Sequence, residues 1–179
     1  DLTVTGVQTC ALPISALRKV YPETREQRCW VHKTANVLNK MPKSVQPRAK
    51  SDLQEIWMAE TRQDSEKAFD TFLEKYGSKY DAACACLEKD RDVLFTFYDF
   101  PAEHWKHLRT TNPIESTFAT IRLRHKRTKG SGSRRTSLAM MFKLAQSAQK
   151  GWRKLNCHEK IIPLLNGKKF VNGVQQDAA

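Results

Sequence analysis

The sequence predicts a mainly α-helical protein with a small strand component, that is, a mainly α fold with an α+β remnant. Apolar residues recur at helical spacing through residues 45–98, as in Leu53, Ile56 and Trp57. A further amphipathic pattern runs from Leu138 to Trp152. Only one short apolar run, at the end of residues 24–31, has the composition of a buried strand. Helices should therefore make up most of the fold.

We expect five segments along the chain. Residues 1–15 read like a translated sequencing adapter, so native sequence is expected to begin near Ala16. The segments are a foreign leader (1–15), a helix–strand–helix unit (16–44), a helical unit (45–100), a unit with an acid-headed helix and basic helices (101–158), and a tail (159–179). The end of the tail, Gly167 to Ala179, has little core character and is expected to lie on the surface or fray.

Prolines and capping residues indicate where the individual helices begin and end. A first helix should stop at Pro22, and the strand at 24–31 should be followed by a helix over residues 33–41. Within residues 45–98, Asp64 is the expected N-cap of the second helix and Gly77 its expected C-terminal cap. The aromatic residues of these helices are expected to form the core.

The positive charge is concentrated in one part of the chain. The formal net charge is +12, with 31 lysines and arginines against 19 acids. Residues 116–158 contain no Asp or Glu and hold 11 of the basic residues, whereas the rest of the chain is nearly neutral. A concentrated block of this kind is typical of a surface that binds a polyphosphate.

Several functional classes are excluded by composition. No apolar run approaches the roughly 18 residues of a membrane span, so no membrane role is expected. The seven glycines form no phosphate-binding loop, which argues against a nucleotide as ligand. Five irregularly spaced cysteines argue against a disulfide framework and favour a reducing cytoplasm.

One carboxylate stands at the head of the basic block. Asn112 is the expected N-cap of a helix and Pro113 its first residue, with Glu115 in the first turn. Phe118 and Ile121, with Leu123, are expected to bury one face of this helix. An acid beside so much positive charge indicates metal-dependent chemistry on a polyanion. The same spacing also fits a capping box, in which the acid only binds the N-cap amide.

A divalent-metal site would need more than this one acid. Two Mg²⁺ ions roughly 3.5–4 Å apart can activate an attacking oxygen and stabilise a leaving one. Mg²⁺ prefers oxygen ligands, and one carboxylate cannot hold two ions. The partners of Glu115 must therefore come from elsewhere.

A second pattern is the pair Cys29 and His32, in Cys-x-x-His spacing. Such a pair is half of a zinc site, which needs four ligands. Cys157 and His158 are adjacent to each other and match the usual second pair poorly. A buried cysteine with a hydrogen-bonded histidine at a strand-to-helix junction is the simpler interpretation.

These motifs together resemble a known family. They are Gln27-x-Cys29-x-x-His32-Lys33-x-x-Asn36-Val37, a helical stretch, Arg109-Thr110-Thr111-Asn112-x-Ile114-Glu115, and then the basic helix. In this order they resemble the C-terminal part of a mutator-type bacterial insertion-sequence transposase, from about Ala16 to Val174.

The resemblance implies an RNase H-like catalytic domain, here truncated and interrupted by an all-helical insertion. Glu115 corresponds to the Glu of an Asp-Asp-Glu triad, as catalytic residue and ligand of Mg²⁺ or Mn²⁺ in the intact protein. Cys29 and His32 belong to a family motif of unsettled role. The implied DNA-binding residues are Arg109, Asn112, Arg122, Arg124, His125, Lys126, Arg127, Lys129, Arg134 and Arg135.

The resemblance also implies the partners of an intact member and two catalytic aspartates that we do not find in this chain. An intact member would cut and join DNA as a homo-oligomer, in the bacterial cytoplasm at the nucleoid. The second Asp should fall near Gln8, inside the adapter-like leader, and the first should lie further upstream. The chain alone is therefore expected to be inactive in cleavage.

Two rival interpretations remain. The first is a non-catalytic, basic helical module that binds nucleic acid. The second is a structural helical protein whose basic face binds an acidic protein partner. The first predicts that neutralising Glu115 changes nothing, and the second predicts no competition by duplex DNA.

Overall fold

The computed structural model describes residues 17–110, 112–129 and 132–176. Within these residues helix dominates, and the only sheet is a two-stranded antiparallel hairpin that pairs Phe170 with Gln175 and Val171 with Val174. The prediction of a mainly α protein is confirmed. No helix in these ranges is long and apolar enough to cross a membrane.

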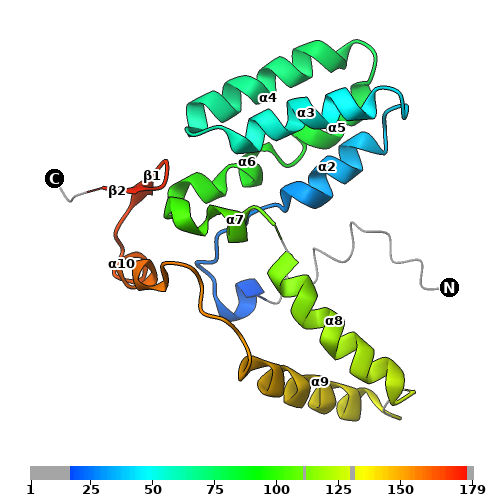
Figure 1. Cartoon of the computed structure of the whole chain (residues 1–179), viewed down its shortest axis with the longest axis vertical. Helices are drawn as coiled ribbons and strands as arrows, with labels where there is room; N and C mark the ends of the chain where they lie inside the picture. Colours follow the sequence, from blue (N-terminus) through cyan, green and yellow to red (C-terminus); the bar gives the residue numbers. More distant parts are fainter. Residues whose placement is uncertain (1–16, 111, 130–131, 177–179) are drawn as a thin grey trace.

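The elements follow one another closely along the chain (Figure 1). Residues 17–20 are helical. The helices are α2 (Trp30–Leu38), α3 (Gln46–Met58), α4 (Arg62–Gly77), α5 (Asp81–Glu88), α6 (Arg91–Leu94), α7 (Trp105–Leu108), α8 (Asn112–Arg127), α9 (Arg134–Gln149) and α10 (Ile161–Leu165). Short 3₁₀ turns are η1 (Thr96–Asp99), η2 (Ala102–His104) and η3 (His158–Lys160), and the strands are β1 (Phe170–Val171) and β2 (Val174–Gln175).

Helices α2 to α7, with the 3₁₀ turns η1 and η2 between them, pack into a body around one apolar core. The buried side chains come from the positions with helical spacing in the sequence. They include Val37, Leu53, Ile56, Phe69, Phe72, Tyr76, Leu87 and Leu94. The predicted core of residues 45–98 is therefore confirmed. Burial and a hydrogen bond to Asp52 raise the pKa of Tyr76 to about 12.

The N-terminus of α4 corrects one predicted cap. Thr61, not Asp64, is the N-cap: its Oγ1 accepts from the Asp64 amide at 3.1 Å and donates to the Asp64 carboxylate at 2.7 Å. Asp64 occupies the third helical position, which is the acidic half of a capping box. Threonine and aspartate side chains both suit the N-cap position, so the sequence alone does not show which of the two residues is the cap.

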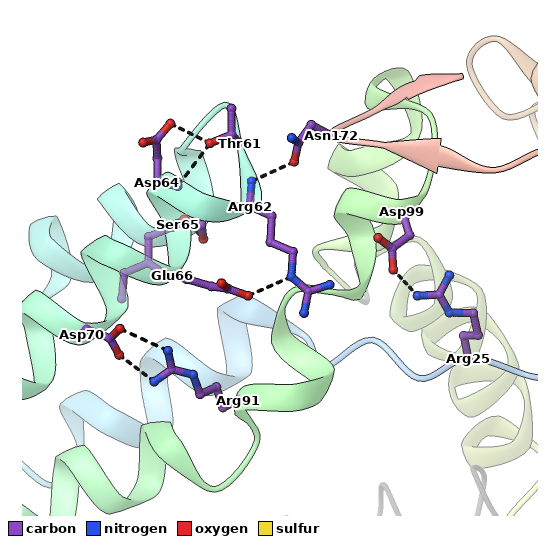
Figure 2. Close-up of polar contacts among 11 residues, drawn as sticks. Arg25, Thr61, Arg62, Asp64, Ser65, Glu66, Asp70, Arg91, Asp99 and Asn172 are labelled. Carbon is purple, nitrogen blue, oxygen red and sulfur yellow. Dashed lines mark hydrogen bonds and ion pairs between the residues drawn. The ribbon is translucent and has the colours of Figure 1, made fainter. Parts of the chain in front are cut away.

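The predicted strand at 24–31 is wrong. Residues 24–29 have no regular structure, and Trp30 already begins α2. Side chains fix this segment in place of a strand ladder: Gln27 Nε2 donates to Leu94 O at 3.0 Å, and Arg25 pairs with Asp99 (Figure 2). A strand needs a neighbour, and in the part of the chain that the structure describes no strand lies beside this segment.

The tail prediction is wrong for the β1–β2 hairpin. Phe170 is buried, and the hairpin turn contacts two parts of the body. The Asn172 carboxamide oxygen accepts from the Arg62 amide at 2.9 Å, at the first residue of α4 (Figure 2). Gly173 N donates to Tyr98 O, and Gly173 O accepts from Ala102 N, both at 3.2 Å. The end of the chain is therefore part of the packed structure.

This turn predicts a large effect of adding one methyl group. Gly173 has φ +80°, and a Cβ there would lie 2.6 Å from Ala102 Cβ. We expect Gly173→Ala to lower the free energy of unfolding by about 1–3 kcal/mol, measured by urea denaturation. Gly77→Ala is the matched control, because a Cβ at Gly77 meets nothing within 4 Å and α4 favours alanine. Equal destabilisation by both variants would contradict the docking of the hairpin.

A buried lysine fixes α2 to the body. Lys33 is 2% exposed, and its Nζ donates to Cys86 O at 2.6 Å and pairs with Asp90 Oδ2 at 2.6 Å. Arg28 Nε lies 3.2 Å from the same carboxylate oxygen. The lysine charge is thus compensated inside the protein, where an uncompensated charge would be costly.

Removing that lysine should destabilise the body strongly. Lys33→Ala leaves the partly buried Asp90 with Arg28 alone and removes the donor to Cys86 O, for which we expect a loss of about 1–3 kcal/mol. The control is Arg62→Ala, which breaks the exposed pair with Glu66 and should cost less than about 1 kcal/mol. Thermal or urea unfolding of the two variants makes the comparison, and a Lys33 effect as small as the Arg62 effect would contradict it.

Helices α8 and α9 lie side by side, on the opposite side of the molecule from α3 and α4 (Figure 1). We call residues 112–149 the arm. Ile121 is buried as predicted, but Phe118 and Leu123 are about half exposed, which corrects the expected apolar face of α8. On α9, Leu138 and Phe142 are also exposed. Within the described residues the arm therefore presents unburied apolar side chains as well as cations, a feature of surfaces that bind partners.

Candidate active site and nucleic-acid interface

Glu115 lies in the first turn of α8. The partial positive charge of a helix N-terminus favours a carboxylate at this place. The side chain is about half exposed. The helix begins at Asn112, close to the predicted start, but the side chain of Asn112 lies outside the described residues. The expected capping box and the expected DNA contact of Asn112 therefore stay predictions.

The structure brings Glu115 to His32. Glu115 Oε1 lies 3.3 Å from His32 Nε2, which joins the two motifs that the sequence keeps far apart. His32 is in the first turn of α2, and its side chain is 54% exposed. This distance is slightly longer than the roughly 2.7–3.2 Å of a usual N–H···O hydrogen bond. An acid and a histidine thus share one open surface at the junction of the body and the arm.

The body holds His32 in place through its neighbours. Trp30 is 1% exposed, and its indole Nε1 donates to Leu94 O at 3.0 Å. Lys33 is fixed by the buried pair with Asp90. Trp30 N donates to Arg109 O at 2.9 Å, which ties the start of α2 to the chain just before α8. The start of α2 is therefore bound to the end of α7, three residues before α8 begins.

Cys29 and His32 face different surroundings. Cys29 is 6% exposed and precedes α2 directly as its N-cap residue, whereas His32 points to the surface. The predicted burial of Cys29 is confirmed. Cys157 and His158 lie near η3, where the backbone oxygen of Cys157 lies 3.1 Å from His104 Nε2. Nothing in this arrangement builds a zinc site from the two pairs.

The described residues do not make a metal site by themselves. Within 17–110, 112–129 and 132–176, no group of three or more His, Cys, Asp and Glu side chains could hold a metal ion. Glu115 offers a carboxylate, the ligand type that Mg²⁺ prefers. The donor chemistry suits the predicted ion, but the number of donors falls short.

The basic residues of the arm are open to solvent. Of the predicted DNA-binding residues, those on the surface of the arm are Arg122, Arg124, Lys126, Arg127, Lys129, Arg134 and Arg135, and His125 is partly buried. Glu115, Arg122 and Lys126 are spaced by seven and four residues, which places them along one side of α8. They span about 16 Å of helix, close to five base pairs of duplex.

Arg109 was predicted to bind DNA, but the structure places its side chain among aromatic rings of the body. Its guanidinium lies over the rings of Trp57 and Phe97, each at 5.4 Å, and of Trp105 at 5.9 Å, and it donates to Trp57 O. Burial lowers the pKa of this guanidinium. These contacts make Arg109 a packing residue of the body. Its predicted contact with DNA is not favoured by this geometry, because it would require breaking them.

Two important groups were missed by sequence reasoning. Lys33 stands in the Gln27–Val37 motif, but nothing in its spacing indicates that it is buried against Asp90. The aromatic residues around Arg109 come from three separate elements, so no local pattern shows them together. The contact of His32 with Glu115 likewise has no signal in residue spacing.

Comparison with known proteins identifies the class. The chain matches the family model described as "Transposase, Mutator family" over residues 9–154. It is therefore a transposase sequence. More particularly, the chain belongs to the Mutator family, as the motifs of Cys29, His32 and Glu115 indicated. The match begins inside the leader, so the foreign origin of residues 9–15 stays a prediction.

Two relatives are similar over most of the chain. The transposase for insertion sequence element IST2 of Acidithiobacillus ferrooxidans is 52% identical, covering 97% of this chain and 62% of the relative. The transposase for IS6120 of Mycolicibacterium smegmatis is 50% identical, covering 88% of this chain and 49% of the relative. A more distant relative, the transposase for ISRM5 of Rhizobium meliloti, is 28% identical. The chain thus spans about half to three-fifths of the length of the first two.

Proposed function

We propose that the chain is part of a transposase that cuts the ends of an insertion sequence and joins them to target DNA. Glu115 is the catalytic carboxylate, one of an Asp-Asp-Glu triad in an RNase H-like catalytic domain, and α3 to α5 belong to the all-helical insertion. One observation carries the proposal: Glu115 stands at the head of the exposed basic helix α8 and contacts His32 of the second motif.

Glu115 would supply one carboxylate to Mg²⁺ or Mn²⁺. Bound ions of this kind activate an attacking oxygen and stabilise the leaving oxygen. The further ligands, two aspartates in the family resemblance, must come from outside the described residues, because these contain no sufficient cluster. We therefore expect the 179-residue chain alone to bind DNA without cutting it.

The arm would hold the DNA beside Glu115. Its exposed arginines and lysines lie on a segment, residues 116–158, that contains no acid. Cations of this kind bind backbone phosphates without reading sequence. Homo-oligomerisation of the intact protein and a place at the nucleoid in the cytoplasm remain predictions, and the exposed apolar residues of the arm would suit a protein contact.

The test is strand cleavage of an element-end duplex by a full-length transposase that contains these residues, with and without Glu115→Gln. A second candidate function, a non-catalytic DNA-binding module, is favoured by the described residues alone, because they contain a basic surface and only one acid of the triad. That alternative predicts equal behaviour of the wild type and Glu115→Gln in every assay.

A further inference from the structure

The contact between His32 and Glu115 suggests a role for the Cys-x-x-His motif. Nε2 of His32 lies 3.3 Å from Oε1 of Glu115. A glutamate side chain has three rotatable bonds, and Glu115 is about half exposed, so the protein must restrict its rotamers if the carboxylate is to act at a fixed place.

His32 is well suited to provide that restriction. Its helix is anchored on both sides of it, by the buried indole of Trp30 and by the buried ammonium group of Lys33. Since α2 residues 30 and 33 face the body, His32 projects from a surface that cannot easily shift. The backbone hydrogen bond from Trp30 to Arg109 O holds this surface to the end of α7, three residues before α8 begins.

The chemistry of the two groups permits this role. An imidazole ring can donate through Nε2, and a carboxylate has two oxygens with about four lone-pair positions. A carboxylate can therefore accept a hydrogen bond from a histidine and still bind a further group. Partners that orient a metal-binding carboxylate in this way contribute about 10–100-fold to metal affinity or activity.

We propose that His32 is the positioning residue of Glu115: it holds the carboxylate in one orientation toward the DNA strand. Cys29 contributes to the position of His32 indirectly. It is a small buried residue, and its size allows the N-terminus of α2 to lie against the body. This inference rests on the proposed function of Glu115. It assigns to His32 no direct contact with DNA and no proton transfer.

The first measurement detects the contact in the 179-residue chain. The ring nitrogens of His32 are observed by ¹⁵N NMR in the wild type and in Glu115→Ala. We expect a resolved change of the Nε2 signal in Glu115→Ala and no change for His158, an exposed histidine elsewhere on the surface. Identical His32 signals in the two proteins would overturn the inference.

The second measurement uses the full-length transposase and element-end DNA. We expect His32→Ala to lower kcat for strand cleavage by about 10–100-fold and to leave KM for DNA unchanged. His32→Gln should restore most of kcat, because its Nε2 amide can donate from nearly the same place. His158→Ala is the control and should cleave as the wild type does.

The outcomes separate this inference from the proposed function. Wild-type cleavage by His32→Ala together with an inactive Glu115→Gln would overturn the positioning role alone. Equal losses in His32→Ala and His32→Gln, with a lowered melting temperature in both, would show a merely structural histidine and also overturn it. Cleavage by Glu115→Gln would overturn the proposed function itself.

Discussion

Replacing Glu115 by glutamine in the full-length transposase should abolish strand cleavage while DNA binding remains. Glutamine keeps the size of the side chain and removes its negative charge, so a metal ion loses an anionic ligand. We expect the cleavage rate at saturating DNA to fall by at least about 10³-fold, equivalent to ~4 kcal/mol in the barrier. Single-turnover cleavage of a labelled element end, with Mg²⁺ and with Mn²⁺, is the measurement.

The control is Glu55→Gln. Glu55 is an exposed acid on α3, away from the arm, and its neutralisation changes net charge by the same amount. We expect wild-type cleavage from this variant. Equal cleavage by Glu115→Gln and wild type would favour the non-catalytic binding module. A loss of DNA binding in Glu115→Gln that matches the loss of cleavage would show that Glu115 acts in binding and not in chemistry.

Neutralising three cations of the arm should weaken DNA binding on the order of 10²-fold at moderate salt. Arg122, Lys126 and Arg134 are exposed and come from both helices of the arm. Hydrogen bonds to charged groups contribute about 1.5–3 kcal/mol each before screening by salt. Their replacement by glutamine preserves helix propensity. Fluorescence anisotropy with a labelled duplex measures the affinity of the 179-residue chain.

The salt dependence gives a sharper criterion than affinity. Each phosphate contact that is lost should reduce the slope of log K against log salt by about 0.9, so the triple variant should lose roughly 2.7. The control replaces three exposed lysines of the body, Lys67, Lys79 and Lys89, by glutamine. This control variant changes the net charge by the same amount as the triple variant of the arm. Equal effects of the two triple variants would mean that DNA responds to net charge and not to the arm.

If duplex DNA does not bind the chain at any salt concentration, the basic surface serves another partner. An acidic protein would then be the natural candidate, as in the second rival interpretation. The two triple variants still distinguish a localised surface from a general charge effect in that case.

Sequence periodicity predicted the helical body well, because helices α3 to α5 each bury one regular stripe of side chains. Leu53, Ile56, Phe69 and Phe72 lie in the core where their spacing placed them. Local patterns suffice when the buried face of an element is also its apolar face. The start of α8 next to Glu115 was also predicted to within one residue, from the Asn112-Pro113 pair.

Long-range contacts were not predictable in this way. The run at 24–31 has the composition of a strand, but a strand exists only when a neighbour completes its hydrogen bonds. Phe170 appeared to be an isolated apolar residue in a polar tail, yet it is buried. Whether Lys33 is buried depends on Asp90, a residue far along the chain. The contact of His32 with Glu115 depends on the fold in the same way.

The location of the cut strand relative to Glu115 tests the central claim most directly. A structure of the full-length transposase bound to an element-end duplex would show it. We predict that an oxygen of the scissile phosphate lies within roughly 4 Å of a Glu115 carboxylate oxygen, as two ligands of one Mg²⁺ ion do, with the duplex along the basic side of α8. A duplex bound on another face, with Glu115 remote from any phosphate, would contradict the account.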